Sequence, residues 1–169
     1  ANLVLVARTK SELAKTAKAI QATGSSALIL PADVAAATTA PKAVRMCRDA
    51  FGRVDILVSA AGIVGPIGPV EIEDPKDWAR TLDVNLTATF LFMRAVLPIM
   101  KSRRRGKIIT LSGGGAANSR PMYAAYAASK AAVVRLTETV AEEVKRFNIQ
   151  VNAIAPGAVN TRMLDDMLE

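Results

Sequence analysis

The stretch "VDILVSAAG", residues Val54 to Gly62, decides the fold of this chain. It opens with mostly apolar and β-branched residues, and small residues with a glycine follow at once. A run this short, with turn residues directly after it, predicts a strand that is buried on both faces. Longer helical patterns lie on either side, so the stretch predicts one strand of a parallel sheet whose strands alternate with helices.

The same alternation extends in both directions along the chain. The predicted strands are Asn2–Ala7, Ala27–Pro31, Val54–Ser59, Lys107–Leu111 and Ile149–Ile154. The predicted helices run from about Lys10 to Ala22, from Thr38 or Thr39 to Phe51, from Asp74 through the apolar residues 86–100 with a bend or interruption on the way, and from about Met122 to Arg146. Right-handed crossovers between such elements give an α/β fold, an open, doubly wound parallel sheet between two layers of helices. The chain begins almost inside a strand and stops within a predicted helix, so we expect one domain over residues 1–169 that is truncated at both ends.

Composition restricts the class of protein and its chemistry. The chain has 169 residues, of which 51% are hydrophobic and 22% charged, as in one soluble globular domain. No apolar run reaches the roughly 18 residues of a membrane span and no export signal is visible, so we expect a cytoplasmic protein without a membrane partner. With one cysteine and no histidine, an internal disulfide, the usual metal-ligand sets and histidine-based triads are excluded, and we predict no metal. Cys47 lies in a helical pattern and is interpreted as a packed side chain, with a nucleophile as the alternative.

The net charge of +7 raises the question of an anionic partner. The densest basic cluster, Arg103 to Arg105, stands before Gly106 at the end of an apolar helical pattern, where cations oppose the negative end of the helix dipole. No aromatic stacking ladder accompanies these arginines. We therefore predict no nucleic-acid partner; a nucleic-acid-binding domain is an alternative that rests on charge alone.

Small or polar residues stand at the carboxyl end of every predicted strand. They are Ala7 with Arg8, Asp33, Ser59 with Ala60, Ala61 and Gly62, Ser112, and Pro156 with Gly157. Ligands of open parallel sheets bind beyond this edge, so the five strand ends predict one shared ligand site.

The motif "YAASK", Tyr126 to Lys130, lies in the last long helical pattern. Tyr126 and Lys130 are one turn apart on one helix face, so the ammonium can stabilise a tyrosinate and lower the pKa of the phenol. Such a phenol donates a proton to a carbonyl oxygen or removes one from an alcohol. Tyr123 is the competing phenol, but no lysine follows it four residues later.

Five motifs together resemble the short-chain dehydrogenase/reductase (SDR) family over almost the whole chain. They are "ADV" at 32–34, "SAAG" at 59–62, "DVNLTATF" at 83–90, "YAASK" at 126–130 and "VNAIAPGAVNTRM" at 151–163. The resemblance implies a Rossmann-like dinucleotide-binding domain that transfers a hydride between a nicotinamide cofactor and a small carbonyl or secondary-alcohol substrate. It also implies a homo-oligomer, either a dimer or a tetramer, formed through the helix over residues 86–100 and the helix that carries Tyr126.

The resemblance assigns roles residue by residue. Tyr126 is the catalytic acid or base, Lys130 also binds the nicotinamide ribose, and Asn85 belongs to the proton relay, with a helix-bend or cap role as the alternative. The implied cofactor contacts are Asp33 and Val34 near the adenine, with a turn role for Asp33 as the alternative, then Ser59, Ala60, Ala61 and Gly62, and finally Pro156, Gly157 and Thr161 near the nicotinamide amide. Thr161 can cap a helix at the same time.

Arg8 favours NADP over NAD as the cofactor. An acidic side chain at this strand end would bind the ribose hydroxyls of NAD, whereas a guanidinium there can bind the 2′-phosphate of NADP. No acid is present at Ala7, Arg8 or Thr9. An exposed structural arginine is the alternative.

Three departures from the family pattern stand beside these matches. The glycine-rich turn of the form Thr-Gly-x-x-x-Gly-x-Gly and the strand before it are absent from this sequence, and Ser59 replaces the usual asparagine. The position of the catalytic serine, 13 residues before the tyrosine in the family, is Gly113. The neighbouring Ser112 is the candidate donor in its place, and its alternative role is that of a turn residue. A non-catalytic binding or scaffolding protein on the same fold is therefore the second hypothesis.

Overall fold

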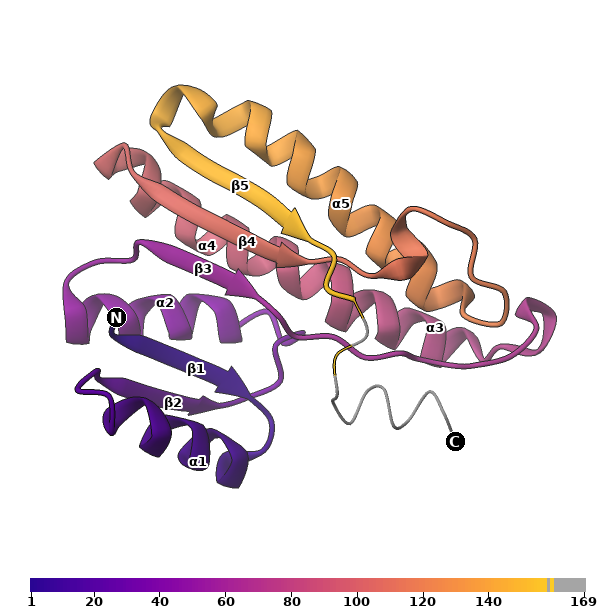
Figure 1. Ribbon diagram of the computed structural model, residues 1–169, viewed down its shortest axis with the longest axis horizontal. Helices are drawn as coiled ribbons and strands as arrows, with labels where there is room; N and C mark the ends of the chain where they lie inside the picture. Colours follow the sequence, from indigo (N-terminus) through magenta and orange to yellow (C-terminus); the bar gives the residue numbers. More distant parts are fainter. Residues whose placement is uncertain (158, 160–169) are drawn as a thin grey trace.

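The computed structural model describes residues 1–157 and 159. In these residues five strands alternate with helices, as the sequence predicts (Figure 1). The strands are β1 (Leu3–Ala7), β2 (Ala27–Pro31), β3 (Ile56–Ser59), β4 (Gly106–Leu111) and β5 (Ile149–Ile154). The α-helices are α1 (Lys10–Gln21), α2 (Thr39–Phe51), α3 (Pro75–Leu82), α4 (Ala88–Arg103) and α5 (Ala124–Val144). Single 3-10 turns cover Val70–Ile72, Gly114–Ala116 and Lys145–Phe147.

Several element boundaries differ from the sequence prediction by one or two residues. Strand β3 starts at Ile56 rather than Val54. Helix α5 starts at Ala124 rather than Met122, because Met122 has a φ of 70°, in the left-handed region that does not continue into a helix.

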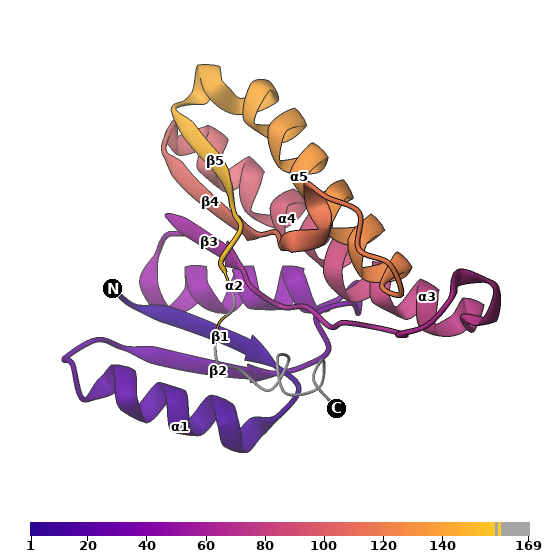
Figure 2. The same ribbon diagram turned by 45° about the vertical axis from the view of Figure 1, so that its right-hand side comes forward.

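Every ladder is parallel, and within the described residues the sheet is in two parts. Strand β1 pairs with β2, and β4 lies between β3 and β5, whereas no ladder joins β1 to β3 (Figure 2). The family resemblance implies a strand before β1, and a strand between β1 and β3 would join the two parts. The α/β class and the parallel direction of the strands agree with the prediction.

Strand β3 is not buried on both faces, contrary to the prediction. Leu57 packs against the core, while Ile56 and Val58 are each 55% exposed on the other face. Helix α4 covers one face of the sheet behind β4 in Figure 1, and nothing among the described residues covers Ile56 and Val58. The continuous apolar run indicates a strand that is suited to burial on both faces, but no described helix or loop covers the face that carries Ile56 and Val58.

The main core lies between the three-stranded part of the sheet and helices α4 and α5. Its buried members include Met93, Val96, Met100, Ile108, Val140 and Val144. By length and composition the helix from Pro75 to Arg103 could cross a membrane, the one such helix among the described residues, a feature that the sequence analysis did not anticipate. Three of its apolar side chains lie inside the core, since Met93, Val96 and Met100 are 1%, 2% and 0% exposed. The core therefore accounts for part of the helix's apolar character, since 33% of its most apolar 18-residue window is buried.

Helices α3 and α4 form one continuous rod that is disturbed between them. The residues Asp83–Thr87 form a π-helical turn, which is the interruption that the sequence predicted before the apolar stretch. π-helical turns of this kind often stand at functional sites, and this one carries Asn85. At the far end of α4, Arg104 has a φ of 50° as the C-cap and donates a hydrogen bond to the carbonyl of Arg146. This arginine of the basic cluster thus ends a helix.

Candidate active site

The carboxyl ends of the strands meet at one edge of the molecule. In Figure 1 the arrowheads of β1, β3, β4 and β5 point toward the same side, where the loops after each strand gather. The parallel registers of β3, β4 and β5 require this arrangement. The predicted site residues Ser59, Ser112 and Pro156 therefore lie along one edge, as the shared ligand site requires.

Helix α5 brings the predicted acid and its lysine to the end of β4. Tyr126 is 6% exposed and Lys130 is 5% exposed. The Lys130 ammonium donates a 2.9 Å hydrogen bond to the carbonyl oxygen of Leu111, the last residue of β4, and its nitrogen lies 5.7 Å from the centroid of the Tyr126 ring. The backbone of β4 thus fixes the lysine beside the tyrosine.

The pKa of Tyr126 does not follow the sequence expectation. Burial raises it above the ordinary value of 10.0, and the positive charge of Arg120, rather than that of Lys130, offsets part of this rise. The pKa of Lys130 is lowered from 10.5 by its own burial. Burial dominates because it disfavours the charged form of each group. The phenol therefore remains protonated at neutral pH, which suits a proton donor.

Gly113 lies directly against the Tyr126 hydroxyl. A Cβ atom built on Gly113 would stand 2.5 Å from the Tyr126 hydroxyl oxygen, so a side chain at this position would point at the reactive group and displace it. Ser112 Oγ is buried and has no hydrogen-bond partner among the described residues. The structure therefore does not bring the Ser112 hydroxyl into a hydrogen bond with Tyr126.

Asn85 holds the loop after β3 in place. Its side-chain oxygen accepts a 2.8 Å hydrogen bond from the amide of Ile63, and its nitrogen donates to the Ile63 carbonyl and to Ser129 Oγ, both at 2.9 Å. The residue is 1% exposed, and the hydroxyl of Thr89 donates to its backbone carbonyl. The π-helical turn thus directs an amide group into the space between the loop and α5.

Asp33 forms the turn after β2 and an ion pair. One carboxylate oxygen accepts a hydrogen bond from the amide of Ala35 at 3.0 Å, and the other pairs with Arg80 of α3 at 2.7 Å. The backbone hydrogen bond, then Arg80 and the charge of Arg8, lower the pKa of Asp33. Arg8 is close enough for its charge to act on Asp33. The turn role that was the alternative for Asp33 is present in the structure.

The remaining candidates differ in how accessible they are. Ser59 shares a 2.9 Å hydrogen bond with the hydroxyl of Thr89 on α4. Val34 and Gly62 are half-buried, whereas the other four small residues are exposed, namely Ala60, Ala61, Pro156 and Gly157. Thr161 lies outside the described residues. Exposed small residues leave the backbone of the β3 and β5 loops open to a ligand.

Sequence reasoning missed three residues that complete this arrangement. Arg80 pairs with Asp33, Ser129 binds the amide of Asn85, and Arg120 stacks on Tyr123 with its guanidinium carbon 4.6 Å from the ring centroid. Ser129 lies inside the "YAASK" motif and could have been noticed there. No local sequence pattern identifies Arg80 or Arg120. Arg80 pairs with Asp33, which is far away in the sequence, and the stacking of Arg120 on Tyr123 depends on the conformation of the loop before α5.

The side chains present suit the two ends of a dinucleotide. Asp33 and Arg8 stand at the edge where an adenosine end would lie, and Tyr126 and Lys130 stand at the other, where the unpartnered hydroxyl of Ser112 is also buried. The described residues include no Thr-Gly-x-x-x-Gly-x-Gly turn for a pyrophosphate. Among them, no group of three or more Cys, Asp or Glu side chains is placed to hold a metal ion.

Comparison with known proteins identifies the family. The sequence model described as short chain dehydrogenase matches residues 1–169. The chain is 34% identical over 148 residues to a 3-oxoacyl-[acyl-carrier-protein] reductase of Synechocystis sp., covering 88% of this chain and 60% of that protein.

Solved structures give the same result for the fold. An NAD+-bound xylitol dehydrogenase superposes with a TM-score of 0.95 at 30% identity, covering 99% of this chain and 65% of the other. A gluconate 5-dehydrogenase from Burkholderia cenocepacia, in complex with NADP and tartrate, gives a TM-score of 0.88 at 31% identity, over 98% and 65%. The chain thus spans less than two thirds of the length of each of these relatives. With the family match extending over all its residues and with the same parallel α/β architecture, the chain belongs to the short-chain dehydrogenase family.

Proposed function

We propose that this chain forms the catalytic core of an oxidoreductase that transfers a hydride between NADP(H) and a carbonyl or secondary-alcohol substrate. The observation that carries the proposal is the buried Tyr126 with Lys130 fixed beside it at the end of β4. The oxidoreductases among its relatives and the nicotinamide cofactors in two of their structures support the general class of reaction.

In the proposed mechanism Tyr126 handles the proton. A nicotinamide cofactor, held by Lys130 and by the loops after β3 and β5, would supply or accept the hydride. Tyr126 donates its phenolic proton to the carbonyl oxygen during reduction and takes it back during oxidation. The Lys130 ammonium stabilises the tyrosinate that remains, and its hydrogen bond to Leu111 fixes it near the ring. Its proposed second role is to bind the nicotinamide ribose.

The other predicted residues have supporting roles in this proposal. Asn85 orders the loop through Ile63, and its amide is already fully engaged, which favours a positioning role over direct proton transfer. Ser112 stays a candidate donor to the substrate, since its buried hydroxyl has no hydrogen-bond partner among the described residues. Pro156, Gly157 and Thr161 remain proposed contacts of the nicotinamide amide.

The proposed preference for NADP rests on Arg8. It stands at the end of β1, near Asp33, where the sequence analysis places the 2′-phosphate of the cofactor. Titration of the full-length gene product with NADPH and NADH, followed by calorimetry, tests this assignment. We expect Arg8→Met to weaken NADPH binding and to leave NADH binding nearly unchanged; equal loss for both would contradict it.

The acid/base role is tested by Tyr126→Phe in the full-length gene product. Loss of a positioned proton donor costs about 10²- to 10⁴-fold in rate, measured as the change in nicotinamide absorbance. Tyr123→Phe is the matched control, since it removes a neighbouring phenolic hydroxyl and retains the ring. Unchanged turnover in Tyr126→Phe would show that the proposed acid is wrong.

A binding or scaffolding protein on the same fold is the second candidate function. Gly113 favours it, because the family's catalytic serine is missing there. Calorimetry with NADPH and NADH distinguishes the two: a scaffold that uses no cofactor gives no binding signal from the full-length gene product.

A homo-oligomer is the proposed assembly. A groove between α4 and α5 is lined by Phe90, Leu97, Leu136 and Val140 together with charged residues. Phe90 is 46% exposed there, as expected of a face that a second copy would cover. We also propose a cytoplasmic location, which rests on the sequence alone.

A further inference from the structure

A groove of about 540 Å³ lies between helices α2 and α4, which contact each other (Figure 1). Its floor is apolar and includes Val44 of α2 with Leu91 and Ile99 of α4, all three half-buried. Small-molecule sites span roughly 300–1,000 Å³, so a small ligand fits this volume. None of the candidate residues at the carboxyl edge lines the groove, which is therefore separate from the candidate active site.

Three guanidinium groups stand over this apolar floor. Arg45 and Arg48 come from α2 and Arg94 comes from α4, and all three side chains are exposed. Arg45 and Arg48 are one helical turn apart and share one face of α2. Asp49 is the acidic residue in the lining. Three positive charges against one negative charge leave the groove with a net charge of +2.

The three arginines have no partner within the described part of the chain. No hydrogen bond or ion pair there engages the side chain of Arg45, Arg48 or Arg94. Arg53, by contrast, pairs with the carboxylate of Asp55 at 2.6 Å. Like charges one turn apart on a helix repel each other, and a bound anion would remove that repulsion.

We propose that the groove between α2 and α4 binds a soluble phosphate monoester with an apolar body. The planar guanidinium fork matches phosphate oxygens and binds them through paired, charge-assisted hydrogen bonds. A phosphate monoester carries a charge of about −1.5 to −2 at neutral pH, which balances the groove's charge, whereas a carboxylate balances only half of it. The apolar floor buries the hydrocarbon part of the ligand. This inference does not depend on the function proposed above.

The test is a calorimetric titration of the full-length gene product with hexyl phosphate. Low ionic strength is used, because salt screens contacts between exposed charges. Hexanol lacks the phosphate and inorganic phosphate lacks the hydrocarbon, so these two probes separate the contributions of charge and apolar surface. We expect hexyl phosphate to bind at least about tenfold more tightly than either probe.

Three variants assign this binding to the groove. Arg45→Met and Arg48→Met should each weaken the binding of hexyl phosphate by about tenfold, since each removes one charged donor. Asp49→Asn should tighten it by about two- to fivefold, because it removes the opposing negative charge. Urea unfolding of the same proteins checks that they fold. A merely structural effect of the substitutions would not give opposite signs. Arg94 is left unchanged because it also lines the groove between α4 and α5.

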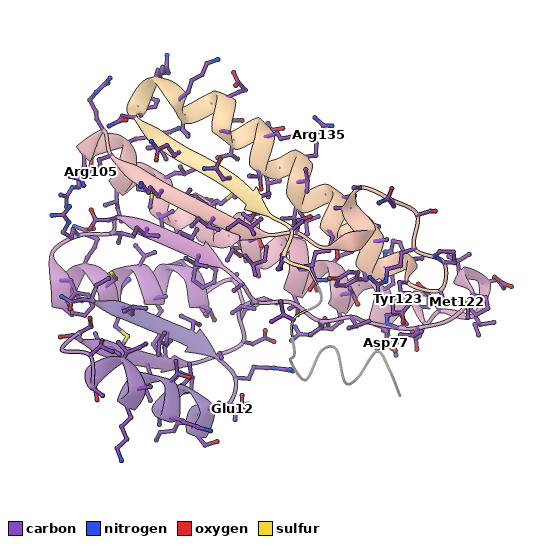
Figure 3. The ribbon with its side chains drawn as sticks, in the orientation of Figure 1. Glu12, Asp77, Arg105, Met122, Tyr123 and Arg135 are labelled. Atoms are coloured by element: carbon purple, nitrogen blue, oxygen red, sulfur yellow. The ribbon has the colours of Figure 1, made fainter. Side chains whose placement is uncertain are left out.

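Two further arginine-to-methionine variants are matched controls. Arg8→Met removes the cation of the proposed 2′-phosphate site, so it reports any binding of hexyl phosphate there. Arg135→Met lies on the outer side of α5, where the side chain is 81% exposed and points away from the sheet (Figure 3). Both variants should keep the full affinity for hexyl phosphate.

Four results would overturn the inference. Hexyl phosphate that binds no more tightly than hexanol would remove the role of the charge. Affinity that survives in the double variant of Arg45→Met and Arg48→Met, or that is lost in Arg8→Met, would place the ligand elsewhere. Binding to vesicles that contain phosphatidic acid without binding to hexyl phosphate would mean that the groove meets a membrane surface. Tighter binding of a hexaglutamate peptide than of hexyl phosphate would mean that an acidic protein segment is the partner.

Discussion

A methyl group at Gly113 should collide with the Tyr126 hydroxyl. Its Cβ would lie 2.5 Å from the hydroxyl oxygen, and the next two atoms, Cζ and Cε1 of the same ring, would lie at 3.3 and 3.5 Å. A normal contact begins near 3.4 Å, so the oxygen must move by about 0.9 Å. Tyr126 is only 6% exposed and has little room to do so. Overpacking of this kind costs about 1–3 kcal/mol.

Removing the hydroxyl should remove the collision. In a Tyr126→Phe background the closest remaining contact of the new methyl group is the 3.3 Å one, which needs only a small adjustment. The backbone at Gly113 is extended, with φ −171°, so alanine fits it without strain and even gains about 0.4–1 kcal/mol through the unfolded chain. We therefore expect Gly113→Ala to destabilise the parent protein by about 1–2 kcal/mol and to be nearly neutral in the Tyr126→Phe background.

Equilibrium urea unfolding of the four full-length proteins, at one protein concentration, measures this as a double-mutant cycle. The expected coupling energy between the two positions is about 1–2 kcal/mol. Gly114→Ala is the control, because its Cβ would lie 3.5 Å from Nη1 of Arg120, which is an ordinary contact, and it should show no coupling to Tyr126. If Gly113→Ala costs the same in both backgrounds, the tyrosine hydroxyl is not where the structure places it.

Three further predictions follow from the described contacts. Asn85→Ala should lower the free energy of unfolding by about 2–4 kcal/mol, because the amide and carbonyl of Ile63 lose buried partners, and the same urea experiment measures it. The pKa of Asp33 is lower in the folded protein than its ordinary value of 3.8, so Asp33 contributes stability above that value and loses it as the pH falls through the folded pKa; Asp33→Asn should flatten this acid loss in unfolding curves between about pH 5 and 2. Phe90→Glu should convert the proposed oligomer to a smaller species in sedimentation velocity, and an unchanged sedimentation coefficient would move the interface elsewhere.

The carboxyl edge illustrates what local sequence can and cannot predict. The order of strands and helices, the interrupted helix before residue 88 and the juxtaposition of Tyr126 with Lys130 all follow from patterns within a few residues, and the structure contains each of them. The exposure of Ile56 and Val58 does not follow, because it depends on whether another element covers that face of β3. A run of apolar residues indicates that a strand is suited to burial, and it does not indicate which element covers each face.

By itself, the sequence determined the α/β class and the parallel edge on which the candidate site lies, because both follow from hydrophobic period, which is a local property of the chain. The proposed acid and its lysine were chosen from the sequence as well, through the motifs at the strand ends and the family that they resemble. Only the tertiary structure decided the state of that acid. The contact of Tyr126 with Gly113, the rise in its pKa on burial and the nearby guanidinium of Arg120 depend on distances between β4, its loop and α5. Desolvation and Coulomb energies depend on such distances in space, and these distances cannot be inferred from how far apart two residues are in the sequence.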